Sequence, residues 1–174
     1  DDGTKSSVGV WLPGEIIPSW LANAIQAGYL IEAHNYAFEK AIWDNIAVPH
    51  HGWPAIKPEQ WRCSMAVARY LALPPGLDAL CRALGLPGKD PEGKRLISRY
   101  SKLYLATAKL EIPPEDLEKF IAYCKQDVLL EERISEYLSD LPETELALFQ
   151  LDQMVNMRGL QLDLAGIACA SQIV

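Results

Sequence analysis

The sequence lacks several features that would assign a protein to a class at once. It has no run of 18 or more apolar residues, which a membrane-spanning helix requires, and no secretory signal at its start. Its four cysteines form no C-x-x-C pair, so neither a zinc ribbon nor a disulfide framework is indicated. No G-x-G-x-x-G or Walker A string occurs, which argues against nucleotide binding by a Gly-rich loop. We therefore expect reduced thiols, no membrane partner and a cytoplasmic location.

Charge is unevenly distributed along the chain. The 174 residues include 16 basic and 23 acidic side chains, for a net charge of −7, and 49% of the residues are hydrophobic, as in an ordinary globular domain. Residues 115–145 contain ten acids and three bases, so this segment alone carries −7. Residues 82–109 contain seven bases and two acids, and such a segment can attract an anion although the whole chain is acidic. Solvated helix faces are the alternative interpretation of both segments.

The hydrophobic pattern predicts an α/β chain with few strands and many helices. Short segments rich in β-branched and aromatic residues predict strands at Val8–Leu12 and Leu30–Ala33. The prolines and the glycine in Val48–Pro58 predict a loop over this segment. Periodicity and cap residues predict helices at 19–27, 35–47, 63–71, 77–84, 91–101, 115–138 and 143–158, the sixth with a break near its middle.

One residue interrupts the apolar stripe of the helix predicted over 115–138. Phe120, Cys124 and Ile134 mark this stripe at helical spacing, and Asp127 occupies a position where an apolar residue is expected. A half-buried carboxylate must be paired, hydrogen-bonded or bound to a metal. Tyr123 precedes it by one turn, so its hydroxyl can reach the space in front of the carboxylate. The alternatives are that Asp127 caps a second helix or pairs with an arginine.

A second group of polar residues lies where the strand Leu30–Ala33 passes into a helix. Asn35 is expected to cap that helix, whose apolar stripe continues through Phe38 and Ile42. Glu39 lies in the first turn, where the helix dipole favours the ionised carboxylate, a suitable ligand for a hard cation. An ordinary surface cap is the alternative, because Asn caps followed by Glu are common.

Together these two groups resemble motifs of the DEDD 3′-5′ exonucleases. Asn35-x-x-Phe38-Glu39 resembles their second motif, N-x-x-(F/Y)-D, and Tyr123-x-x-x-Asp127 resembles the third motif of the tyrosine branch. Essentially the whole chain is similar to the proofreading domain of bacteriophage-type family A DNA polymerases. The strings that carry this wider resemblance are AHNYAFEKAIWDNI, WRCSMAVARYLALP, KDPEGKRLI, YCKQDV and LFQLDQMVNMRGLQLDL.

The resemblance implies a fold and an activity. It implies an incomplete ribonuclease-H-like α/β exonuclease domain over residues 1–141, followed at 142–174 by the helical start of a polymerase domain. The implied reaction removes 3′-terminal nucleotides from single-stranded or frayed DNA by two-metal hydrolysis with Mg²⁺ or Mn²⁺. By this resemblance Asp127 and Glu39 would bind metal, Tyr123 would orient the attacking water, and Asn35 would support substrate binding. The implied partners are DNA and the polymerase domain of the same parent chain, in a phage or prophage of a bacterial host.

The sequence departs from the family pattern at two points. Position 39 is Glu where the motif has Asp. The first motif, D-x-E at the end of a strand, is missing, because Asp90-Pro91-Glu92 lies in a turn and Asp116-Leu117-Glu118 on a helix. We expect the family's first strands to precede Asp1. Two carboxylates are few for two hard cations, so we expect the 174 residues alone to bind metal weakly and to be inactive or nearly so.

The sequence contains other candidate sites and leaves two rival functions open. Lys94, Arg95 and Arg99 form a basic run that is expected to contact DNA phosphates. The adjacent His50 and His51 are not expected to share a metal ion. One rival function is a degenerate, non-catalytic lobe that binds DNA or serves as a scaffold. Another is a ribonuclease-D-like RNA 3′ exonuclease, against which the polymerase-like segment 148–164 argues.

Overall fold

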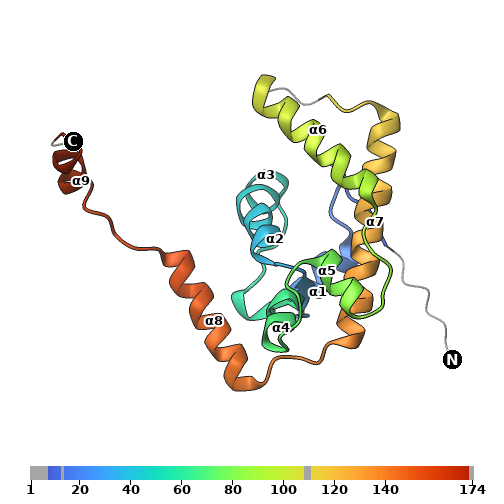
Figure 1. The fold of residues 1–174 in the computed structure, drawn as a ribbon, viewed down its shortest axis with the longest axis horizontal. Helices are drawn as coiled ribbons and strands as arrows, with labels where there is room; N and C mark the ends of the chain where they lie inside the picture. Colours follow the sequence, from blue (N-terminus) through green and yellow to red (C-terminus); the bar gives the residue numbers. More distant parts are fainter. Residues whose placement is uncertain (1–7, 13, 108–110, 173–174) are drawn as a thin grey trace. The chain divides into compact units, whose positions relative to one another are not determined.

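The computed structural model describes residues 8–12, 14–107 and 111–172. The chain forms two compact units, Asp1–Asp140 and Leu141–Val174 (Figure 1). In the described part of the chain, none of the helices is long and apolar enough to cross a bilayer.

The first unit is mostly helical. Its elements in chain order are α1 (Ser19–Gln26), β1 (Ile31–Ala33), α2 (Ala37–Ile42), the π-helix η1 (Trp43–Ala47), α3 (Val48–His51), the 3₁₀ helix η2 (Pro58–Gln60), β2 (Trp61–Cys63), α4 (Ser64–Tyr70), α5 (Leu77–Ala83), α6 (Pro91–Thr107) and α7 (Pro114–Tyr137). A proline opens both α6 and α7, where its missing N–H and fixed φ cost a helix nothing. The predicted helices are confirmed within about two residues for α1, α4, α5 and α7. α6 continues beyond the predicted end at 101, and α7 is unbroken.

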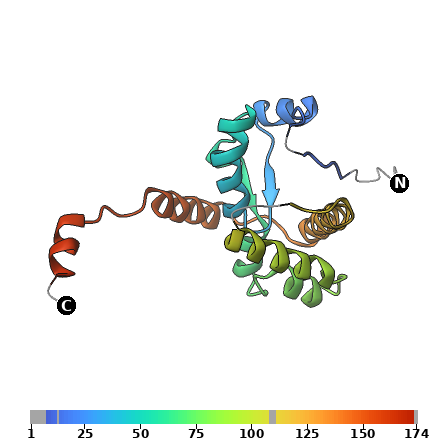
Figure 2. The ribbon, with the colours of Figure 1, turned by 90° about the horizontal axis from the view of Figure 1, so that it is seen from above.

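A small parallel sheet lies among these helices. β1 pairs with β2 in the register Ile31 to Trp61, Glu32 to Arg62 and Ala33 to Cys63 (Figure 2). The strand predicted at Leu30–Ala33 is therefore confirmed as β1. β2 was not predicted, because its three residues run directly into the helical pattern of α4. Parallel pairing with helical connections agrees with the α/β class.

The strand predicted at Val8–Leu12 is wrong. These residues belong to no helix or strand and pair with no strand among the described residues. A local turn holds the end of the segment instead: the Leu12 amide donates to Glu15 Oε2 at 2.8 Å, and the Trp11 indole donates to the Glu15 carbonyl at 2.7 Å. β-forming side chains alone do not make a strand without a neighbouring ladder.

The start of the helix after β1 differs from the prediction. Asn35 is not its N-cap but adopts a left-handed conformation with φ of 66°, in the turn that leads from β1 to Tyr36, the residue before α2. Asn tolerates this conformation better than most residues, which allows the sharp reversal. The helical path then continues through η1 into α3 and ends at Gly52, so the predicted loop at Val48–Pro58 is wrong for its first four residues.

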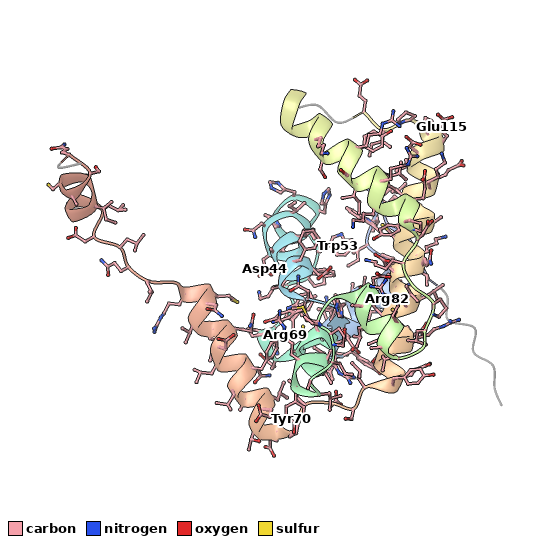
Figure 3. All side chains as sticks on the ribbon, viewed as in Figure 1. Asp44, Trp53, Arg69, Tyr70, Arg82 and Glu115 are labelled. Carbon is pink, nitrogen blue, oxygen red and sulfur yellow. The ribbon has the colours of Figure 1, made fainter. Side chains whose placement is uncertain are left out.

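Aromatic residues determine which side of this helical segment faces inward. The apolar stripe of Phe38 and Ile42 is exposed at 63% and 43%. On the other side, the ring of Trp43 packs edge-on against that of Trp53 at 4.7 Å, and the Trp43 indole donates to the Pro54 carbonyl at 2.8 Å. Trp53 is labelled in Figure 3. The two indole rings are therefore half-buried, whereas the stripe of Phe38 and Ile42 is exposed.

The largest fully buried apolar side chains among the described residues of the first unit lie on its last three helices. Leu80 of α5, Leu96 of α6 and Ile134 of α7 are fully buried. Each buried side chain of this size contributes roughly 1.5–3 kcal/mol by leaving water. This packing fixes the side of α7 that faces the sheet.

The second unit contains two helices, α8 (Glu143–Arg158) and α9 (Leu164–Ala170). α8 confirms the helix predicted after Pro142. Gly159 ends it with φ of 64°, and the Asp163 carboxylate caps α9 by accepting the Gly166 amide at 2.9 Å.

Candidate functional site

Helix α7 carries three candidate site residues at successive turns. Tyr123, Asp127 and Glu131 are four residues apart, so they lie on one face of the helix. Polar contacts attach this face to the sheet: Ser135 Oγ donates to Glu32 Oε2 on β1 at 2.6 Å, and the His34 amide donates to Glu131 Oε2 at 3.3 Å. The segment that follows β1 is thereby held beside the acidic face of α7.

Asp127 is bonded to a lysine. Its Oδ2 atom lies 2.7 Å from Nζ of Lys89, and its side chain is 19% exposed. The other oxygen, Oδ1, is buried and has no hydrogen-bond partner among the described residues. The prediction that this carboxylate needs a partner is confirmed, and the partner is a lysine rather than the arginine considered from the sequence. Burial alone would lower the pKa of Lys89, but its hydrogen bonds to Asp127 and Tyr123 outweigh burial and raise that pKa.

Tyr123 lies between this ion pair and the start of α6. The Lys89 ammonium is 5.3 Å from the centroid of its ring. A Cβ atom placed on Gly93 would come within 1.9 Å of the Tyr123 ring, so only glycine at this position allows the two helices to approach so closely. Burial raises the pKa of the Tyr123 hydroxyl, with Asp127 adding to the effect and Lys89 opposing it. The hydroxyl therefore remains protonated and can donate a hydrogen bond at neutral pH.

Glu131 has the most perturbed carboxyl group of the site. The pKa of this group is raised from 4.5 to about 7, mainly by burial; the negative charges of Glu39 and Asp127 add to the shift, and the His34 amide and Lys89 oppose it. Three carboxyl groups thus influence one another, two of them from α7 and one from α2. Such mutual repulsion is typical of sites that hold a cation.

The turn after β1 is fixed by His34. Nε2 of its ring is 2.8 Å from the Pro75 carbonyl, so this nitrogen carries the proton, and Nδ1 accepts from Ser64 Oγ at 3.1 Å. Burial lowers the pKa of His34, which keeps the ring neutral. His34 therefore ties the end of β1 to α4 and to the segment before α5.

Glu39 lies in the first turn of α2, as predicted. Its Oε2 atom is buried, and no residue in the described part of the chain forms a hydrogen bond with it. Burial raises its pKa and outweighs the opposing backbone hydrogen bond. The backbone at the helix start thus favours the ionised form of Glu39, as expected, but burial has the larger effect.

The donor chemistry of these residues suits a hard cation only in part. Carboxylate oxygens are the ligands that Mg²⁺ prefers, and Glu39 and Asp127 each keep one buried oxygen unpartnered. Among the described residues, however, no group of three or more His, Cys, Asp or Glu side chains is arranged to hold a metal ion. Asp127 is bonded to an ammonium group instead.

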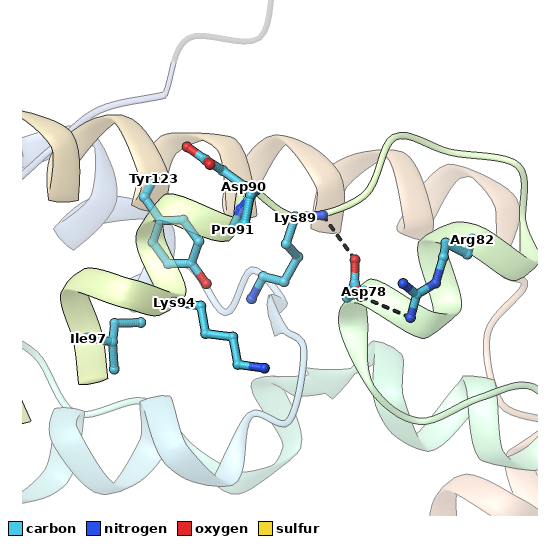
Figure 4. Close-up of a pocket in the computed structure, with 8 residues that line it drawn as sticks. All are labelled: Asp78, Arg82, Lys89, Asp90, Pro91, Lys94, Ile97 and Tyr123. Atoms are coloured by element: carbon cyan, nitrogen blue, oxygen red, sulfur yellow. Dashed lines mark hydrogen bonds and ion pairs between the residues drawn. The ribbon is translucent and has the colours of Figure 1, made fainter. Parts of the chain in front are cut away.

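A cavity of about 570 Å³ opens beside Tyr123 (Figure 4). Its basic lining residues are Arg82, Lys89 and Lys94, and Arg82 is paired with Asp78 at 3.0 Å. The close-up shows the amino groups of both lysines directed into the space in front of the tyrosine hydroxyl. The residues that line the cavity are Asp78, Arg82, Lys89, Asp90, Pro91, Lys94, Ile97 and Tyr123.

The structure separates the three basic residues predicted to contact phosphate. Lys94 lines the cavity. Arg95 is paired with Glu92 on the exposed side of α6, and Arg99 NH1 lies 3.2 Å from Oδ2 of the buried Asp116. Of the three, Lys94 is thus placed beside the predicted catalytic tyrosine, whereas both arginines have carboxylate partners elsewhere.

Sequence reasoning missed three residues of this site. Glu131 follows Asp127 by four positions on the same stripe, and that spacing is the signal that could have identified it. Lys89 appears in the sequence only as one member of a basic segment, and nothing local indicates that it reaches α7. Gly93 is a helix-disfavouring residue near the start of a predicted helix, which indicates a close packing contact.

Comparisons with known proteins give one relative. A DNA polymerase of Bacillus phage SP02 is 34% identical to this chain in an alignment of 176 positions, which covers 91% of the chain and 26% of the polymerase. The chain is thus related in sequence to part of a DNA polymerase and spans about a quarter of that relative's length. No protein-family model matches the chain, and no solved structure is significantly similar to it.

Proposed function

We propose that this chain is the 3′-5′ exonuclease region of a DNA polymerase, which removes 3′-terminal nucleotides from DNA. The observation that carries the proposal is the placement of Tyr123 and Asp127 one turn apart on α7, beside the segment after β1 that bears Glu39. The similarity to a phage DNA polymerase supports DNA rather than RNA as substrate. The incomplete ribonuclease-H-like fold and the start of a polymerase domain after residue 141 belong to the same proposal.

Each residue has a defined part in this function. Asp127 and Glu39 are proposed as metal ligands, because each has a buried oxygen without a partner. A bound Mg²⁺ or Mn²⁺ would supply an activated water and would neutralise charge on the phosphate. Tyr123 keeps its proton and can orient a water molecule through its hydroxyl. Lys94 faces the cavity and can pair with a phosphate. Asn35 adopts a left-handed turn, which determines where α2 begins and therefore where Glu39 lies.

The test is trimming of a 3′-labelled single-stranded oligonucleotide. The protein that contains this region in its natural reading frame should trim the label in the presence of Mg²⁺ or Mn²⁺. Asp127→Asn should lower the rate by about 100-fold or more, because it removes a metal-binding charge. Glu118→Gln, an exposed substitution on the same helix, is the matched control and should leave the rate unchanged. Trimming that survives Asp127→Asn would refute the proposal.

A non-catalytic lobe that binds DNA or serves as a scaffold is the second candidate. The specific observation in its favour is the Lys89 ammonium bonded to Asp127, together with the lack of a three-ligand group among the described residues. The same assay separates the two candidates, since a scaffold lobe would show no trimming by the wild type. For a non-catalytic DNA-binding lobe, we would still expect binding to DNA, and the affinity should fall with added salt and with Lys94→Met.

A further inference from the structure

Lys89 reaches the acidic face of α7 from a segment that is itself anchored. Its backbone amide donates to Asp78 Oδ1 at 3.1 Å, immediately before α6 begins. From there its side chain extends past the ring of Tyr123 (Figure 4). Its Nζ atom lies 2.7 Å from Oδ2 of Asp127. The side chains of Lys89 and Asp127 are only 28% and 19% exposed. The contact is therefore a partly buried ion pair rather than a mobile surface pair.

The ion pair lies where negative charge accumulates. Asp127 and Glu39 both raise the pKa of Glu131, and Lys89 lowers it, so all four groups share one electrostatic environment. In the described part of the chain, Lys89 is the basic residue bonded to Asp127. Two carboxylate oxygens, one on Glu39 and one on Asp127, are buried without partners. The Lys89 ammonium thus offsets part of the negative charge of these carboxyl groups, but it does not provide a hydrogen bond to every buried carboxylate oxygen.

We infer that the Lys89 ammonium holds Asp127 in place of a divalent cation, so that Lys89 and a metal ion compete for this carboxylate. The inference rests on the proposed role of Asp127 as a metal ligand. An ammonium hydrogen-bonded to Oδ2 and a dication bound to the same carboxylate repel each other strongly at such short separation. Metal binding must then displace Lys89 from Asp127, and the lysine sets how tightly the site binds metal.

The experiment measures binding of Mn²⁺ alone to the 174-residue chain by calorimetric titration, without DNA. Lys89→Met keeps the length and apolar stem of the side chain but removes the charge. It should increase Mn²⁺ affinity by about tenfold or more, because the competing cation is gone. Lys94→Met is the matched control, since it removes an equal charge from the same cavity without an ion pair to Asp127. Its Mn²⁺ affinity should rise by no more than about twofold.

Two further measurements keep the result decisive. Lys89→Met should unfold at a lower temperature than wild type in a chelator and should gain more from added Mn²⁺, because binding to the folded state stabilises it. Lys89→Gln, which retains a donor for Asp127, provides a milder change if the Met variant does not fold. Adding Asp127→Asn to either variant should abolish the gain in affinity.

Equal affinity in wild type and both Lys89 variants, a gain equalled by Lys94→Met, or no Mn²⁺ binding by any of them would overturn the inference. The outcome is independent of the trimming assay. A chain that trims no DNA but binds Mn²⁺ more tightly after Lys89→Met fails the proposed function and supports the competition. A chain that trims DNA while its Mn²⁺ affinity is unaffected by Lys89→Met supports the proposed function and contradicts the competition.

Discussion

The raised pKa of Glu131 makes a quantitative prediction about stability. In the folded chain the carboxyl group titrates near 7, whereas its ordinary value is 4.5. The folded state therefore binds a proton more tightly than the unfolded state between these two values. The stability that Glu131 contributes is fully present below pH 4.5 and is lost as the pH rises through 7. A shift of this size corresponds to about 3 kcal/mol lost above pH 7.

The perturbation is Glu131→Gln, which keeps the shape and an oxygen to accept the His34 amide. The free energy of unfolding is measured by urea titration, followed by tryptophan fluorescence, from pH 4 to pH 8.5 in a chelator. The variant minus wild-type difference should be near zero at pH 4 and approach about 3 kcal/mol in favour of the variant at high pH. The titrations of Glu39 and His34 occur in both proteins and largely cancel in this difference.

The control is Glu136→Gln, which removes an exposed carboxyl group from the same helix. Its difference from wild type should be small at every pH, because surface substitutions of this kind change stability little. A flat curve for Glu131→Gln would show that burial does not perturb this carboxyl group. A curve of opposite slope would show that the ionised form makes a favourable contact. Either result would refute the reasoning.

Two other perturbations test the surroundings of α7. Gly93→Ala places a Cβ within 1.9 Å of the Tyr123 ring, so we expect a loss of about 1–3 kcal/mol in urea unfolding and a displaced tyrosine; unchanged stability would contradict this close approach. Asp116→Asn removes the negative charge of the carboxylate that accepts the Tyr100 hydroxyl at 2.5 Å, a bond that holds the pKa of Asp116 below its usual 3.8. Stability from this carboxylate is present above pH 3.8 and is lost as pH falls through the lowered pKa, so the variant should melt below wild type at pH 7 and the gap should close in acid. A gap that persists at low pH would contradict that account.

The sequence predicted what depends on local pattern. Helix periodicity located α7, and the break in its apolar stripe singled out Asp127 as a residue in need of a partner. β1 was predicted from its composition. β2 was not, because three residues leave too little pattern, and Val8–Leu12 has strand-forming residues without a neighbouring strand to pair with.

What could not be predicted depends on contacts between distant segments. Lys89 lies 38 positions before Asp127, and only the packing of α6 and its preceding segment on α7 brings them within 2.7 Å. The raised pKa of Glu39 likewise follows from burial that no local pattern reveals. A left-handed turn at Asn35 stands where a cap was predicted, and it follows directly on His34, whose amide is bonded to Glu131 from a distant segment.

That bond between the His34 amide and the Glu131 carboxylate has a spectroscopic consequence. Most slowly exchanging amides are protected by backbone carbonyls within one ladder or helix, and they report the opening of that element. The His34 amide is protected by a side chain from a helix 97 positions away. Its hydrogen-exchange rate therefore measures how often the end of β1 separates from α7, even while both elements stay folded. One proton thus monitors whether the two halves of the candidate site are together.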